Sequence, residues 1–157
     1  VLIKELAKRH ETIVFAESCT GGLLSSSITS VSGSSQVFQG GIISYSNDLK
    51  NSLLNITEEK LTKYGAVSEE VCESMAINIK NKLGADWAIA ISGIAGPNGG
   101  SPDKPVGLVF ISISGPNNHI TNIKKLFNPT RNRIEIQTLS VNVCLNTLRL
   151  ILLSSSK

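Results

Sequence analysis

Segments rich in β-branched residues alternate along the chain with segments of helical periodicity. This alternation is typical of a largely parallel sheet with helices on both faces, because parallel strands are joined through helical crossovers. We predict strands at residues 12–17, 38–44, 86–91, 106–114 and 120–127. We predict helices at residues 2–10, 22–31, 47–54, 57–64, 68–83 and 130–152. The last two strands form an antiparallel hairpin, so the expected fold is a three-layer α/β/α sandwich with a mixed, mostly parallel sheet.

Polar capping residues and apolar spacing locate the helices. Residues that commonly begin helices stand at Asn47, Thr57, Ser68 and Thr130. In the helix after Ser68, apolar residues recur every four positions, at Val71, Met75, Ile79 and Leu83. In the final helix one face is expected to carry Ile134, Val141, Leu145, Leu148 and Leu152.

Length and composition indicate one globular domain that covers residues 1–157. The chain is 41% hydrophobic and 17% charged, which excludes a disordered or low-complexity protein. Only 4% of the residues are aromatic, so the core is expected to consist mainly of Ile, Leu, Val and Ala.

Charge and cysteine usage exclude several classes of function. The net charge of +3 is scattered, without the basic stripe and stacking aromatics of a nucleic-acid-binding surface. No uninterrupted apolar run reaches the roughly 18 residues that span a membrane, so we expect no membrane partner. Cys19, Cys72 and Cys144 form no C-x-x-C pair. They predict a reduced, cytoplasmic protein without a structural metal.

Two unusual loops follow predicted strands, at residues 16–22 and 93–100. Ligands of open α/β sheets bind beyond the carboxyl ends of the strands, so the two loops are expected to meet at one edge. The first loop suits a phosphate or an oxyanion if its helix-start N–H groups point outward, but a simple tight connection would look the same. The second contains four glycines and a proline, a composition typical of loops that line a site.

Five motifs in order resemble the CinA C-terminal domain family. They read AESCTGG at 16–22, YSN at 45–47 followed by Lys50, GAVS at 65–68, SGIAGPNGG at 92–100 and KPVG at 104–107. The resemblance implies hydrolysis of the carboxamide of nicotinamide mononucleotide (NMN) to nicotinate mononucleotide and ammonia, with no cofactor. The residues themselves offer no motif around His10 or His119 for a Ser-His-Asp triad, and no metal-ligand cluster.

The resemblance places the nucleophile at Ser18 and the base at Lys50. A position in the first turn after Asn47, together with burial, would lower the pKa of Lys50. Spacing alone favours an ordinary exposed helix lysine, and it is the resemblance that favours a base. Tyr45 is expected to support the lysine, contact substrate or close the sheet edge. The residues expected to bind substrate are Cys19, Thr20, Gly21, Gly22, Gly93, Ile94, Ala95, Gly96 and Arg131. Thr20 could instead cap a helix, and Cys19 is expected to be a buried, inert thiol.

The substrate phosphate needs a cationic partner. The resemblance implies a Gly-x-Arg turn before the last helix and a second arginine one turn later. Arg131 matches the first arginine, but Pro129 replaces the glycine and Glu135 replaces the second arginine. Glu135 shares a helix face with Arg131 and could pair with it, whereas Arg133 is expected to point the opposite way.

Three functions therefore stay open from the sequence. The first is a Ser–Lys amidohydrolase that acts on NMN. The others are a non-catalytic CinA-type module that binds a nucleotide or a protein, and an amidase for a small amide without phosphate. Further apolar residues on the last helix predict either a helix-mediated homodimer or deeper burial within one chain: Ile136, Leu139, Val143 and Ile151.

Overall fold

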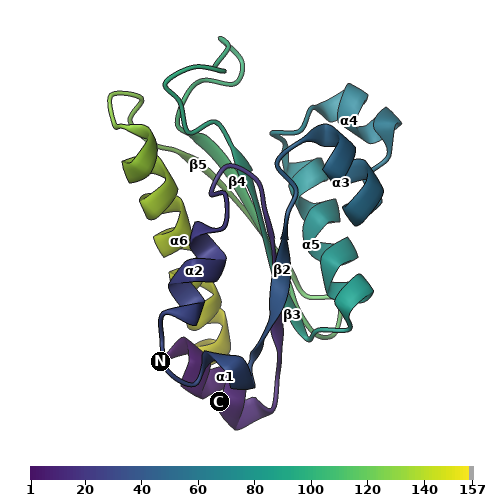
Figure 1. Cartoon of the computed structure of the whole chain (residues 1–157), viewed down its shortest axis with the longest axis vertical. Coiled ribbons are helices and arrows are strands. Elements are labelled where there is room, and N and C mark those ends of the chain that lie inside the picture. Colours follow the sequence, from purple (N-terminus) through teal and green to yellow (C-terminus); the bar gives the residue numbers. More distant parts are fainter. Residues whose placement is uncertain (156–157) are drawn as a thin grey trace.

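The computed structural model describes residues 1–155, and in this part of the chain five strands form one sheet. The strands are β1 (Ile13–Glu17), β2 (Phe38–Ile43), β3 (Trp87–Gly93), β4 (Leu108–Ser114) and β5 (Ile120–Leu126). Their order across the sheet is β2-β1-β3-β4-β5 (Figure 1). β1 pairs in parallel with β2 and β3, while β4 pairs antiparallel with β3 and β5. The predicted mixed sheet is therefore confirmed, and β4 runs against the direction shared by the other strands.

Helices cover both faces of the sheet (Figure 1). One face carries α1 (Leu2–Arg9), α2 (Leu23–Thr29) and α6 (Arg133–Ser154). The other face carries α3 (Asn47–Leu54), α4 (Glu58–Tyr64) and α5 (Glu69–Leu83). A short 3-10 turn, η1 (Ser34–Gln36), leads into β2. The predicted three-layer α/β/α sandwich is confirmed.

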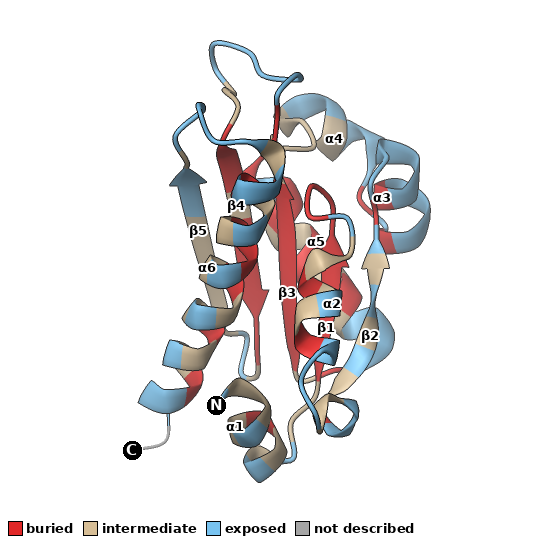
Figure 2. Ribbon diagram, turned by 60° about the vertical axis from the view of Figure 1, so that its left-hand side comes forward, coloured by how far each residue is buried: buried red, intermediate tan, exposed pale blue. Residues whose placement is uncertain are grey.

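Side-chain alternation in β1 divides the core between the two faces. Ile13 and Phe15 lie in the cluster that includes the apolar residues of α2 and α6. Val14 and Ala16 lie in the opposite cluster with the apolar residues of α5. All four are fully buried, because both faces of a central strand are covered by helices. The strands β3 and β4 are buried in the same way (Figure 2).

The start of α6 differs from the prediction. The hydroxyl of Thr130 donates to Asn128 Oδ1, and the helix is capped instead by Asn132. Asn132 and Glu135 form a reciprocal capping box, which satisfies two amides at the helix start. Ile134 consequently points outward and is 72% exposed rather than in the core.

Ile136 on the same helix packs into the hydrophobic core. Ile136 is fully buried in the cluster on this face of the sheet, so its apolar character is explained within one chain. By length and composition alone α6 would be able to cross a membrane, yet one of its faces packs on the sheet. Two other predictions differ from the structure. α3 is capped by Ser46 rather than Asn47. Leu83, predicted to continue the apolar face of the helix after Ser68, is 40% exposed.

The strand order creates a switch point between β1 and β3. The chain leaves β1 through α2 toward β2 and returns through α3, α4 and α5 to β3 on the other side of β1. Loops that leave neighbouring strands in opposite directions separate at such a point and open a crevice at the carboxyl ends. The two loops singled out in the sequence follow these two strands.

Candidate active site

A cavity of about 250 Å³ lies where the loops after β1 and β3 meet. The first loop is joined to the end of β3 by the backbone N–H of Ser18, which donates to the carbonyl of Ile91 at 3.1 Å. The residues that line the cavity are Ser18, Cys19, Tyr45, Lys50, Ala66, Val67, Ser92, Gly93, Ile94, Ala95, Gly96, Asn98, Gly99 and Arg133. The predicted meeting of the two loops at one sheet edge is confirmed.

Lys50 reaches Ser18 from the third helix. Ser46 caps α3 by accepting from the N–H of Leu49, and this places Lys50 one turn into the helix with its side chain directed under the sheet edge. The lysine is 1% exposed, and its Nζ lies 3.0 Å from Ser18 Oγ. Nζ also donates to the carbonyl of Ser44 at 2.6 Å and lies 3.5 Å from the carbonyl of Tyr45.

Burial shifts Lys50 toward its neutral form. Burial lowers the pKa of Lys50 below its ordinary value of 10.5, because desolvation disfavours the ammonium form. Within residues 1–155 no carboxylate lies at ion-pair distance from Nζ. A neutral amine has two N–H donors and one lone pair. Two backbone carbonyls can take up the donors, and the lone pair then faces the Ser18 hydroxyl.

The carboxylate of Glu17 occupies the start of α2. Glu17 is 1% exposed and precedes the nucleophile candidate by one residue. It accepts hydrogen bonds from the backbone N–H groups of Gly22, Leu24 and Ser25, at 3.1, 3.0 and 2.8 Å, and from the hydroxyls of Thr20 and Ser25, both at 2.7 Å. Of the two possibilities left open for this loop, helix-start amides that face a ligand are excluded for Gly22, Leu24 and Ser25, because an internal carboxylate already uses them.

Three residues that were predicted to bind substrate have other roles in the structure. The Thr20 hydroxyl donates to the Glu17 carboxylate, so it neither caps α2, whose N-cap is Gly22, nor lines the cavity. Gly21 and Gly22 form the turn into α2, where their positive φ angles of 57° and 102° suit glycine. None of the three is among the described residues that line the cavity.

The residue after Ser18 contributes its backbone rather than its thiol. Cys19 is 5% exposed, and burial raises the pKa of its thiol to about 12. Its carbonyl accepts from Gln137 Nε2 on α6 at 2.8 Å, which holds the loop in place. Within residues 1–155 the backbone N–H groups of Cys19 and Thr20 donate no hydrogen bond. Of these two residues Cys19 lines the cavity, and its N–H is a candidate donor for an oxyanion formed at Ser18.

The loop after β3 forms the opposite wall. Gly93, Ile94, Ala95 and Gly96 all line the cavity, as expected from the sequence. A Cβ at Gly93 would lie 2.8 Å from the carbonyl of Leu108, so the close approach of β4 requires glycine here. No role was predicted for Ser92, whose buried hydroxyl donates to the carbonyl of Ala66 at 2.8 Å. This bond brings the 65–68 segment to the site.

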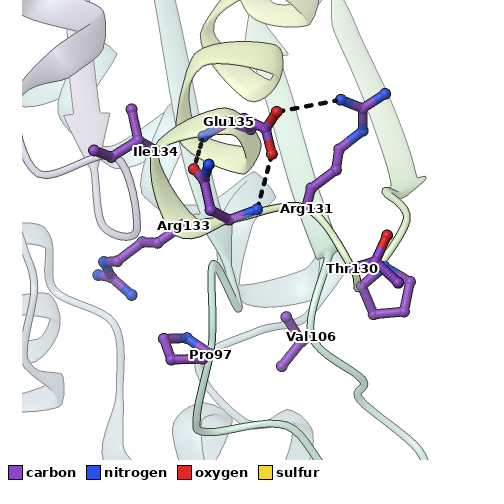
Figure 3. Close-up of a pocket in the computed structure, with 9 residues that line it drawn as sticks. Pro97, Val106, Thr130, Arg131, Arg133, Ile134 and Glu135 are labelled. Atoms are coloured by element: carbon purple, nitrogen blue, oxygen red, sulfur yellow. Dashed lines mark hydrogen bonds and ion pairs between the residues drawn. The ribbon is translucent and has the colours of Figure 1, made fainter.

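Arg133, not Arg131, is the arginine of this cavity. Its Nη1 donates to the carbonyl of Gly96 and its Nη2 to the hydroxyl of Tyr45, both at 2.8 Å. Arg131 lies outside the lining, with its Nη1 3.9 Å from Glu135 Oε1. The two arginines point to opposite sides of the start of α6 (Figure 3). Their opposite directions were predictable from the sequence, but which side holds the cavity was not.

Comparison with known proteins gives consistent results. The family model described as CinA C-terminal domain matches residues 1–152. A CinA-like protein of Prochlorococcus marinus strain MIT 9215 is 86% identical over 157 residues, which are 100% of this chain and 37% of that protein. A CinA-like protein of Trichormus variabilis is 51% identical over 144 residues, 92% of this chain and 35% of that protein. The chain thus spans little more than a third of these relatives.

Solved structures show the same fold at lower identity. The competence/damage inducible protein CihA from Agrobacterium tumefaciens superposes with a TM-score of 0.92 at 36% identity, covering 96% of this chain and 90% of the other. A competence-damaged protein (CinA) superfamily protein from Klebsiella pneumoniae gives a TM-score of 0.91 at 29% identity, covering 98% and 94%.

Proposed function

The chain belongs to the CinA C-terminal domain family, and on that premise we propose that it is an amidohydrolase that converts NMN and water to nicotinate mononucleotide and ammonia. The proposed nucleophile is Ser18 and the proposed base is Lys50. The observation that carries the proposal is the 3.0 Å contact between Lys50 Nζ and Ser18 Oγ at the floor of a cavity.

The first step is acylation of the enzyme. Ser18 Oγ attacks the carboxamide carbon while its proton passes to the neutral amine of Lys50. The carbonyl oxygen of the substrate becomes an oxyanion, which accepts from the backbone N–H of Cys19, a residue of the cavity lining that donates no hydrogen bond within residues 1–155. The C–N bond then breaks, and Lys50 returns the proton to the leaving nitrogen, which departs as ammonia.

The second step is hydrolysis of the acyl-enzyme. Lys50, again neutral, takes a proton from a water molecule that attacks the ester carbon. Collapse of the second tetrahedral intermediate breaks the bond to Ser18 Oγ, and the serine recovers its proton from the lysine. The product is the nicotinate carboxyl group. Tyr45 assists through its carbonyl, 3.5 Å from Lys50 Nζ, and through its hydroxyl, which holds Arg133.

Ammonia release from NMN tests this proposal. We expect turnover by the wild-type chain and a loss of at least about a thousandfold in Ser18→Ala, because the nucleophile is removed. Ser26→Ala is the matched control, because Ser26 is exposed on α2 and outside the cavity lining. Retained activity in Ser18→Ala would refute the assigned nucleophile. Binding of NMN without ammonia release by the wild-type chain would support a non-catalytic nucleotide-binding module instead.

A further inference from the structure

Arg133 stands where two hollows of the surface meet. It lines the 250 Å³ cavity of Ser18 and also a wider hollow of about 930 Å³ along the start of α6. The wider hollow is lined by Pro97, Val106 and residues 129–135 (Figure 3). Any ligand that extends from the inner cavity toward the wider hollow therefore passes this guanidinium.

The guanidinium is fixed in place without being neutralised. Arg133 is half-buried, and its two hydrogen bonds join the loop after β3 to Tyr45. Both acceptors are uncharged, and in residues 1–155 no carboxylate lies at ion-pair distance from it. A guanidinium has five N–H donors in a planar fork, so three remain for a ligand.

The lining of the inner cavity favours an anion. Among the described lining residues the ionisable cationic side chains are Lys50 and Arg133, and none is an aspartate or glutamate. Burial favours the neutral form of Lys50, whereas an arginine stays charged in proteins. The permanent positive charge of the site is thus at its mouth, on Arg133.

We infer that Arg133 binds the phosphate of the substrate, so that this site selects a phosphorylated amide over the corresponding nucleoside, which lacks the phosphate. The inference rests on the proposed function, because it takes Ser18 as the position of the reacting carboxamide. A mononucleotide carries its phosphate at the end remote from the carboxamide. The inner cavity of 250 Å³ is also smaller than the roughly 300–1,000 Å³ of pockets that enclose such ligands. The phosphate end must therefore extend past the mouth, where Arg133 stands.

Arg131 is the competing candidate and is less suited to this role. Its side chain is 47% exposed and pairs with Glu135, which already supplies a carboxylate. Glu135 is itself held in place, because its Oε2 accepts from the N–H of Asn132 at 2.9 Å. A phosphate at Arg131 would compete with this pair and would lie outside the cavity that holds Ser18.

Binding of NMN and of nicotinamide riboside, measured by calorimetry in a Ser18→Ala background, tests the inference without turnover. The riboside lacks only the phosphate, so the ratio of the two dissociation constants reports the contribution of that group. A charge-assisted hydrogen bond contributes enough that Arg133→Met should reduce the NMN preference by about ten- to a hundredfold. Arg131→Met removes the same charge and should change the ratio by less than about threefold.

Two further variants separate binding from folding. Arg133→Lys keeps the charge but loses the planar fork, and it should retain part of the preference for NMN. Arg149→Met removes a half-buried arginine far along α6, outside both hollows, whose guanidinium contacts Asn146, and should leave both affinities unchanged. Riboside binding by Arg133→Met serves as the internal measure that the cavity is intact.

The outcomes also distinguish this inference from the proposed function. Phosphate-dependent binding that requires Arg133, in a wild-type chain that releases no ammonia, would support the inference and refute the amidohydrolase. Equal affinity for NMN and the riboside would overturn the inference even if both are hydrolysed. A larger loss in Arg131→Met than in Arg133→Met, or no binding of NMN at all, would overturn it as well.

Discussion

Replacing Lys50 with methionine is the sharpest test of the Ser–Lys pair. Methionine is also unbranched and fits a buried site, so the change removes the amine while keeping most of the packing. General base catalysis contributes about 10²–10⁴-fold to enzymatic rates. We therefore expect Lys50→Met to lower kcat for ammonia release by at least about a hundredfold.

The effect of Lys50→Met on folding at neutral pH should be small. The variant loses the 2.6 Å hydrogen bond to the Ser44 carbonyl, and leaving a buried acceptor unpaired costs about 1–3 kcal/mol. The variant also removes a buried amine whose pKa is lowered in the folded chain, and removing that unfavourable burial stabilises the fold. These contributions oppose each other, so we expect the free energy of unfolding to change by less than about 2 kcal/mol.

The pH dependence of stability has a defined sign. The folded pKa of Lys50 is lowered, and in the unfolded chain this lysine titrates near its ordinary value of 10.5. Between the two pKa values the unfolded chain binds more protons, so wild-type stability rises with pH and is lost as pH falls toward the folded pKa. Each tenfold difference between the two acid constants corresponds to about 1.4 kcal/mol. Methionine does not titrate, so the wild-type advantage over Lys50→Met should grow toward alkaline pH.

The measurements are a coupled ammonia assay and urea denaturation at several pH values. Wild-type activity should rise with pH as Lys50 loses its proton. Lys82→Met, at an exposed position near the end of α5, is the matched control and should retain activity and the wild-type stability profile. Activity of Lys50→Met within tenfold of wild type, or a stability difference that does not vary with pH, would refute the reasoning.

Two further predictions concern Glu17 and the buried thiols of Cys19 and Cys72. Glu17→Gln places an amide NH₂ among five donors that now face a carboxylate, and it should lower the free energy of unfolding by about 2–4 kcal/mol in urea denaturation. The exposed control Glu70→Gln should change it by less than about 1 kcal/mol, and an equal loss in both would contradict the capping role. The thiols of Cys19 and Cys72, whose pKa values burial raises to about 12, should resist iodoacetamide near neutral pH in the native chain and react once unfolded. Rapid labelling of Cys19 in the folded protein would show that its side chain is accessible and not inert.

Much of the site was predictable because the carboxyl ends of neighbouring parallel strands meet at one sheet edge. The motif after residue 17 and the glycine-rich loop after residue 92 both follow strands that pair in register, Glu17 opposite Ile91. Ser18 and Lys50 were assigned by family resemblance, and the fold brings these two side chains into contact. The chemical role of that contact stays a prediction until activity is measured.

The polar contacts around the site were not predictable in the same way. The N–H groups at the start of α2 were expected to face a ligand, but Glu17 from the preceding strand takes them. Several groups compete for each buried donor, and only the final distances decide which acceptor is used. The spacing of residues in the sequence does not determine these distances between donors and acceptors.

The sequence by itself determined the layers of this protein, because strand-like apolar segments that alternate with helical segments indicate a largely parallel sheet covered on both faces. The tertiary structure decided which arginine serves the cavity. A helix turns about 100° per residue, so the start of α6 at Asn132 and its packing against the core through Ile136 set the direction of Arg133. That direction points to the cavity only because the loops after β1 and β3 open on the same side of the helix.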